Sequence, residues 1–133
     1  MSDTIRLNII SHEGKLFSEE VNFFKCISST GEIGVYPSHT DSVILLESSD
    51  LEYEQGEKVN KVFIRSGVLS ITSNEALIVT DQLANVADIE IDSVNESISN
   101  YTSKFKSEKD YITKEKYRKL ILESEAKLRV KQK

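Results

Sequence analysis

The first part of the chain alternates apolar and polar residues with the two-residue period of β-strands that bury one face. Ile5, Leu7 and Ile9 alternate with Arg6 and Asn8. Similar strand-like segments occur at 21–23, 51–53, 62–64, 69–71 and 77–79, and the segment 62–64 is apolar on both faces. Short strands separated by Gly-, Asn- and Ser-containing turns are typical of an antiparallel sandwich or barrel. The pattern predicts an N-terminal antiparallel β-sandwich over residues 1–87.

Residues 88–133 have a helical pattern instead. The five glycines and the single proline all lie in residues 1–67, so the later residues are free of helix breakers. One predicted helix carries an apolar face made of Ile91, Val94, Ile98, Tyr101 and Phe105. After a polar break at 107–110, a second stripe consists of Tyr117, Leu120, Ile121, Ser124 and Leu128. These stripes, at helical spacing, predict an α-helical hairpin over residues 88–133.

The ends of the two predicted helices carry capping candidates. Asp88 or Asp92 can accept from the free N–H groups that begin the first helix, and Asp110 or Thr113 can do so for the second. Both apolar stripes are thin, and a single helix of this kind is marginal in water. We therefore expect the stripes to pack against each other or against a partner.

Charge is divided unevenly along the chain. Residues 104–133 contain 11 Lys or Arg and 5 acidic residues, whereas residues 1–103 contain 6 basic and 17 acidic residues. A basic helical end is either a solvated surface or a site for an acidic partner. The formal net charge of −5 argues against a nucleic-acid binder.

Composition also restricts the compartment and the metal chemistry. The longest apolar run, 43–46, is far shorter than the roughly 20 residues of a transmembrane helix. The chain start has neither a basic segment nor an apolar run, so no secretory signal is expected. Cys26 is the only cysteine, which excludes an intramolecular disulfide and a multi-cysteine metal site and favours a reducing compartment.

The sequence offers no convincing catalytic, metal or cofactor site. His12 and His39 are the only histidines and belong to no ligand-spaced cluster. Ser38, His39 and Asp41 have the residue types of a nucleophile triad, but neighbours in a chain rarely adopt relay geometry. A role for His39 in shaping a loop or touching a partner is the better interpretation. The segment 31–34 has two glycines but lacks the remaining residues of a phosphate loop.

The segment Gly-Glu-Ile-Gly-Val-Tyr-Pro-Ser-His at 31–39 resembles the epsilon subunit family of F-type ATP synthases. The family pattern there is Gly-Glu-(Ile/Leu)-Gly-(aliphatic)-x-Pro-Gly-His. Ser66-Gly67-Val68 and the aliphatic strand that ends at Asp81 are similar to two further family stretches. The similarity includes the chain length and the order of sandwich before hairpin.

The resemblance implies a non-catalytic rotor subunit of a proton-transporting ATP synthase. Its sandwich would link the gamma subunit to the ring of c subunits, at the cytoplasmic face of a bacterial inner membrane. The residues implied to face the c ring are Gly31, Glu32, Gly34, Pro37 and His39. Candidates for docking on gamma are Ile33, Val35, Val43 and Leu45, although burial in the core is the preferred interpretation for most of them.

The resemblance also implies that the hairpin can fold back or extend, and that it restrains ATP hydrolysis by meeting an acidic segment of the catalytic alpha and beta subunits. The basic residues available for that contact are Lys116, Arg118, Lys119, Lys127, Arg129 and Lys131.

The chain departs from the family pattern at several positions. Ser38 replaces the glycine after the proline, and Val68 replaces the second glycine of a Ser-Gly-Gly stretch. The (Ile/Leu)-Asp-x-x-Arg-Ala motif, by which some members bind ATP, has no arginine here in either alignment of residues 89–96. A guanidinium is the natural fork for phosphate, so we expect weak or absent ATP binding.

Three other functions remain open from the sequence. The main alternative is a free-standing sandwich that binds a peptide or protein through an edge strand. A small hydrolase that uses His39, and a chaperone-like hairpin protein, are the others. Neither a cofactor nor a nucleic acid is expected as a partner.

Overall fold

The computed structural model describes residues 3–131. Within that range the chain forms ten β-strands, one short 3₁₀ helix and two α-helices. The strands are β1 (Ile5–Ser11), β2 (Leu16–Val21), β3 (Phe23–Ser28), β4 (Gly31–Val35), β5 (Ser42–Leu46), β6 (Ser49–Gln55), β7 (Lys58–Ile64), β8 (Gly67–Thr72), β9 (Glu75–Thr80) and β10 (Leu83–Ala84). The helices are η1 (Val86–Asp88), α1 (Ile91–Ser107) and α2 (Tyr111–Lys131). The outermost residues of the predicted sandwich and hairpin, 1–2 and 132–133, lie outside the described range.

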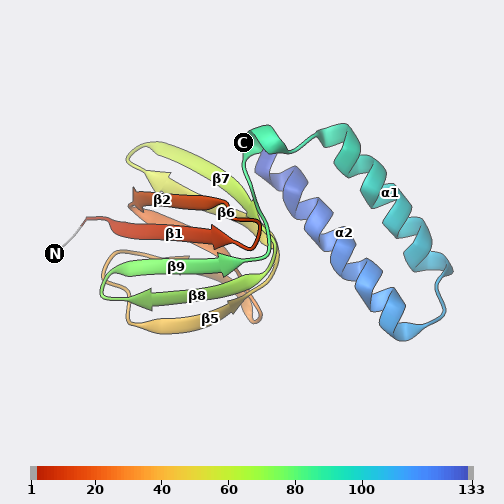
Figure 1. Ribbon diagram of the computed structural model, residues 1–133, viewed down its shortest axis with the longest axis horizontal. Coiled ribbons are helices and arrows are strands. Elements are labelled where there is room, and N and C mark those ends of the chain that lie inside the picture. The colour runs from red at the N-terminus through yellow and green to blue at the C-terminus, as the bar shows by residue number, and fades with distance from the viewer. Residues whose placement is uncertain (1–2, 132–133) are drawn as a thin grey trace.

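The strands build a sandwich, as the sequence predicts. One layer runs in the order β5-β8-β9-β1-β2, and the other contains β10, β7, β6 and β3, with β4 paired to β3. Figure 1 shows the first layer in front and β6 and β7 behind it. The layers are joined where Ser28 of β3 pairs with Leu46 of β5. The pairing is antiparallel except between β1 and β9, which are parallel.

The core lies between the two layers and consists of the inward-facing residues, which alternate with outward-facing ones along each strand. It includes Ile5, Leu7 and Ile9 of β1, all fully buried. The strand 62–64 is buried on both faces, as predicted, because Phe63 points away from this core and lies in a second cluster under the helices. The alternation of the sequence thus predicts which face of β1 is buried, and the double burial of β7 marks where the helices dock.

Two details of the strand pattern need correction. The segment 28–34, whose Ser and Gly residues predict a turn, instead contains most of β4, and only residues 29–30 separate β3 from β4, which begins at Gly31. The alternation at 21–23 belongs to two strands, since the chain leaves β2 at Val21 and enters β3 at Phe23. The intervening Asn22 ties this corner together, because its N–H donates to the carbonyl oxygen of Glu54.

The two helices form the predicted hairpin and lie side by side (Figure 1). Asp110 caps α2, with its carboxylate 3.0 Å from the Thr113 backbone nitrogen. The first helix has no such cap, because Glu90 occupies the capping position without a side-chain hydrogen bond. Asp88 instead accepts from the Asn85 N–H at 3.1 Å within η1. Neither helix, within residues 3–131, is long and apolar enough to cross a membrane.

Candidate docking surfaces

An exposed apolar row crosses the outer face of the first layer. It is formed by Leu45, Val68, Val79, Ile10 and Leu16, one residue from each of β5, β8, β9, β1 and β2. Each residue is paired in register with the next, so their side chains form one continuous strip. Their exposed fractions range from 39% at Val68 to 70% at Leu16. Exposed apolar side chains are normal when scattered, but a contiguous strip of this kind marks a docking surface.

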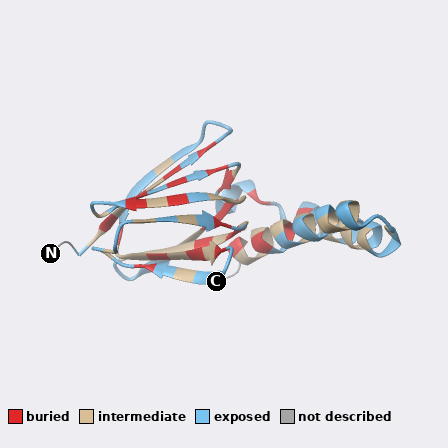
Figure 2. Ribbon diagram, turned by 90° about the horizontal axis from the view of Figure 1, so that it is seen from below, coloured by how far each residue is buried: buried red, intermediate tan, exposed pale blue. Residues whose placement is uncertain are grey.

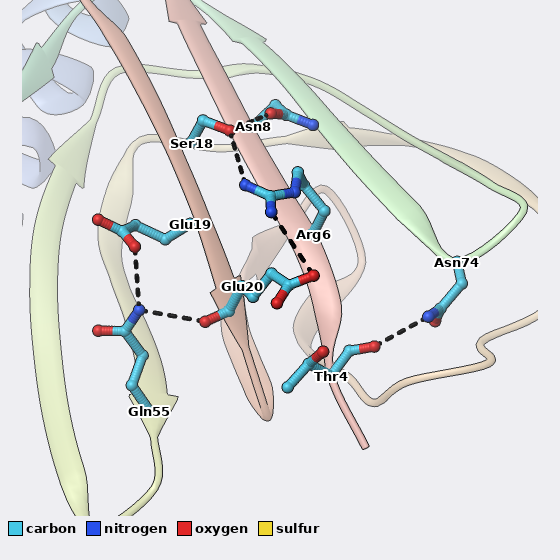
Figure 3. Close-up of polar contacts among 8 residues, drawn as sticks. All are labelled: Thr4, Arg6, Asn8, Ser18, Glu19, Glu20, Gln55 and Asn74. Carbon is cyan, nitrogen blue, oxygen red and sulfur yellow. Dashed lines mark hydrogen bonds and ion pairs between the residues drawn. The ribbon is translucent and has the colours of Figure 1, made fainter. Parts of the chain in front are cut away.

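The apolar row has a polar border on the side away from the helices. The next row of the same face runs Val43, Ser70, Leu77, Asn8 and Ser18, and the one after it contains Arg6 and Glu20. Asn8, Ser18, Arg6 and Glu20 bond to one another, and Ser18 donates to the Asn8 side chain at 2.7 Å. Figure 3 shows this network on β1 and β2. An apolar centre with a hydrogen-bonded polar margin is the composition of a protein–protein interface.

The candidates for docking on gamma separate into two groups. Val43 and Leu45 are 75% and 63% exposed and belong to the outer face just described. Val35 is fully buried, and Ile33 is half-buried against the same core. Val35 is therefore corrected from a docking candidate to a core residue, because its position in β4 turns the side chain between the two layers. Val68, Val79, Ile10 and Leu16 cannot be recognised as surface candidates from the sequence, because they become one surface only through the pairing of distant strands.

The five residues expected to face the c ring do not form a single loop. Gly31 and Glu32 begin β4 beside the β3–β4 turn, whereas Pro37 and His39 follow the other end of this strand. A strand of five residues spans about 16 Å. A partner that touches both Glu32 and His39 must therefore lie along β4 rather than against one tip of the sandwich.

The loop after β4 has a left-handed backbone conformation at Ser38, although this conformation favours glycine. Ser38 has a φ of 65°, in the left-handed region where the family has glycine. Its N–H donates to the Asn74 side chain at 2.7 Å, which offsets part of the strain. Asp41 accepts from the Ser73 N–H, and His39 Nδ1 lies 2.7 Å from the Thr40 carbonyl oxygen. His39 and Asp41 thus bond to other partners, and neither bonds to Ser38 as the relay of a hydrolase requires.

Gly34 in β4 has a packing role. A Cβ added there would lie 2.8 Å from the Phe23 ring. The Phe23 ring in turn stacks on Tyr36, with 4.5 Å between the ring centroids. Tyr36 is 65% exposed, so this aromatic pair adds to the outer surface of β4.

The basic residues of α2 are only partly free. Arg129 pairs with Asp50 of β6, and the Lys127 ammonium lies over the Phe63 ring. Arg118 pairs with Glu115 in its own helix. Lys116 and Lys119 are exposed, and Lys131 is half-buried.

The junction between sandwich and helices lacks the features of a nucleotide site. A cavity of about 370 Å³ there is lined by Asp88 and Glu90, with Lys15 and Lys127 as its cations. The Asn85 N–H and the Lys15 ammonium lower the pKa of Asp88, which keeps this carboxylate ionised. Lys15 lies 3.4 Å from Asp88 and is thus partly neutralised. Two carboxylates in the wall repel a polyphosphate.

Reactive side chains are not gathered into a site in the described part of the chain. Burial, assisted by Glu32, raises the pKa of the Cys26 thiol to about 12, so this group stays protonated. Among residues 3–131, no three His, Cys, Asp or Glu side chains are placed to hold a metal ion.

Fold and surfaces together define a two-part protein: a β-sandwich with an exposed apolar row on one outer face, joined to a helical hairpin with a basic end. The family model of the ATP synthase delta/epsilon chain β-sandwich domain matches residues 4–86. The chain belongs to this ATP synthase delta/epsilon chain family. This membership favours a subunit of a complex over a free-standing binding module.

Curated relatives agree with the family. The ATP synthase epsilon chain of Desulforamulus reducens is 29% identical over 92 residues, which cover 69% of this chain and 70% of the relative. That of Granulibacter bethesdensis is 30% identical over 84 residues, which cover 62% of each chain.

Solved structures share the fold, including the hairpin. A chain of the Euglena gracilis mitochondrial ATP synthase matches with a TM-score of 0.81 and 22% identity, over 96% of this chain and 83% of that one. A chain of the Tetrahymena thermophila central stalk and c-ring assembly matches with a TM-score of 0.62 and 7% identity, over 96% of both.

Proposed function

We propose that this chain is a non-catalytic rotor subunit of a proton-transporting ATP synthase, in which the sandwich links gamma to the c ring. The observation that carries the proposal is the in-register apolar row on the outer face of β5, β8, β9, β1 and β2. A rotor part needs stiffness and adhesion, and the sandwich and this row supply them. The subunit then sits peripherally on the membrane, at the cytoplasmic face in a bacterium.

Gamma and the c ring are assigned to different surfaces. The apolar row docks on gamma, and Val43, just outside the row on the same face, adds to the contact. The c ring contacts the outer surface of β4, from Glu32 past Gly34 to the loop of Pro37 and His39. A bridging subunit requires two such separate surfaces, one for each partner.

Co-purification tests this role. A tagged full-length chain, expressed in its native cells, is expected to recover gamma and c subunits from detergent-solubilised membranes. Contacts centred on apolar side chains are expected to survive moderate salt, because screening weakens only charge pairs. Recovery of the chain without either subunit would show that the proposed role is wrong.

The hairpin is proposed to restrain ATP hydrolysis through its basic residues. Removal of residues 108–133 is expected to raise hydrolysis by the assembled enzyme about two- to tenfold, because each surface ion pair contributes only about 0–1 kcal/mol. Proton-coupled synthesis should persist, since the sandwich carries the coupling.

The truncation is compared with Lys109→Gln, which removes a positive charge between the helices but leaves the basic residues of α2 intact. Equal hydrolysis rates with and without residues 108–133 would exclude regulation by the hairpin. A loss of coupling on truncation would instead move the mechanical role from the sandwich to the helices.

This role requires no nucleotide on the subunit itself. Titration of the full-length chain with Mg-ATP is expected to give no saturable heat in the low-micromolar range, because the helix start lacks arginine and presents Asp88 and Glu90. Tight binding in the calorimeter would show that another set of side chains replaces the family motif.

A further inference from the structure

Within residues 3–131, the hairpin contacts the sandwich at its base, where α1 begins and α2 ends. One small apolar cluster joins the two parts, made of Phe63, Ala84, Ile89, Val94, Ala126 and Val130. Figure 2 shows the buried helical positions gathered where the hairpin meets the sandwich, while the far end is exposed. Tyr111 and Ile112, at the start of α2, are both 79% exposed. The docked position therefore depends on few contacts, and each polar contact at the base has a large share in it.

The polar contacts at the base converge on Asp50 of β6. Its Oδ1 accepts from Arg129 Nε of α2 at 2.9 Å, and its Oδ2 lies 3.9 Å from Lys61 Nζ of β7. The Lys61 ammonium also donates to the carbonyl oxygen of Arg129 at 3.3 Å. Only 16% of the Asp50 side chain is exposed, so water screens its charge poorly. Asp50 and Lys61 thus hold both the side chain and the backbone of one residue in α2.

A second ion pair of opposite polarity fixes the docked position. Arg65 of the sandwich lies 3.3 Å from Glu123 of α2, so in this pair the basic side chain belongs to the sandwich and the acidic side chain to the helix. A helix that slid along the sandwich would lose both pairs together. Two pairs of opposite polarity therefore select one docked position, in the way that charge patterns select partners.

We propose that Asp50 is a latch, which holds the hairpin against the sandwich and keeps Arg129 from any acidic partner. The Arg129 guanidinium can then bind either Asp50, with the hairpin docked, or an acidic partner, but not both at once. Lys127 is held at the same base, over Phe63, whereas Lys116 and Lys119 stay exposed. The consequence for hydrolysis rests on the proposed function, but the latch itself is a property of the isolated chain.

The latch is tested by measuring the docked fraction of the full-length chain. Spin labels are attached to Glu57→Cys, in the β6–β7 turn, and Lys109→Cys, between the helices, and their distance distribution is recorded. The Cys26 thiol stays unlabelled because it is buried in the core, out of reach of the reagent. Asp50→Asn, which keeps the shape but removes the charge, is expected to raise the undocked fraction about tenfold.

Control variants separate the latch from general damage. Arg129→Gln should raise the undocked fraction about as much as Asp50→Asn does. The double variant should raise it little further, because both substitutions remove the same interaction. Glu52→Gln is the matched control, since this carboxylate lies in the same strand but pairs with Lys25 of the sandwich. An unchanged distance distribution in Asp50→Asn, or an equal change in Glu52→Gln, would overturn the latch. Circular dichroism confirms that each variant keeps its fold.

The assembled enzyme distinguishes the latch from the proposed function. Asp50→Asn is expected to lower ATP hydrolysis severalfold while the hairpin is present and to have no effect after removal of residues 108–133. A larger undocked fraction without any change in hydrolysis would leave the latch in place and remove the regulatory role of the hairpin. An unchanged docked fraction in Asp50→Asn would show that Asp50 is not a latch, whatever the effect on hydrolysis.

Discussion

Replacement of Gly67 by alanine is expected to destabilise the sandwich by about 3 kcal/mol or more. Gly67 begins β8 with a φ of +146°, which L side chains rarely adopt. A Cβ at this position would overlap the carbonyl oxygen of Val79 in the neighbouring strand β9. The obstacle is backbone held by a sheet ladder, so it cannot turn aside as a side chain can. Urea unfolding followed by circular dichroism measures the loss.

Gly56→Ala provides a matched control. Gly56 also has a positive φ, +62°, but a Cβ there meets nothing within 4 Å. Its replacement should cost about 1 kcal/mol, from backbone strain alone. Equal losses in the two variants would show that crowding at Val79 contributes nothing. The difference between them measures the close approach of β8 to β9 together with the greater strain of a φ of +146°, the two reasons for glycine at position 67.

A charge in the apolar row is expected to abolish association with gamma. Leu45→Glu or Val79→Glu would place a carboxylate in a desolvated interface, at a cost of about 3 kcal/mol or more, which corresponds to on the order of a hundredfold in affinity. Leu45 and Val79 are 63% and 52% exposed, so the isolated sandwich should keep its stability. Recovery of gamma with the tagged chain provides the measurement, and thermal unfolding provides the check on folding.

Thr72→Glu is the control for this charge. Thr72 is exposed on the same layer, at the end of β8 farther from the helices, and lies outside the apolar row. The same added charge there should leave the recovery of gamma nearly unchanged. Undiminished recovery with Leu45→Glu would show that gamma docks on another face.

The sequence predicts elements better than it predicts surfaces. In β1 only one face is apolar, so alternation alone identifies Ile5, Leu7 and Ile9 as core. In β5 the residues 43–46 are all apolar, so alternation does not decide which face is buried. Pairing with β8 decides it, and turns Val43 and Leu45 outward. Surfaces built from several strands depend on register, which is a property of distant segments.

The second helix illustrates a similar limit. Its predicted stripe includes Ser124, which is buried, and Tyr117, Leu120, Ile121 and Leu128, which are half-buried. Ala126 and Val130 are also buried, yet they lie outside that stripe. They contact the sandwich cluster and not only α1. One helix therefore buries two faces near its end, and a search for a single apolar stripe finds only one of them.

The parallel pairing of β1 with β9 has a consequence for biosynthesis. The first strand to leave the ribosome finds β2 at once, but its other edge stays open until Glu75–Thr80 has also emerged from the ribosome. The nascent chain therefore exposes an incomplete sheet during much of its synthesis, a state that favours capture by chaperones and premature aggregation. Pauses in translation before β9 has emerged should be harmful, whereas later pauses should be tolerated.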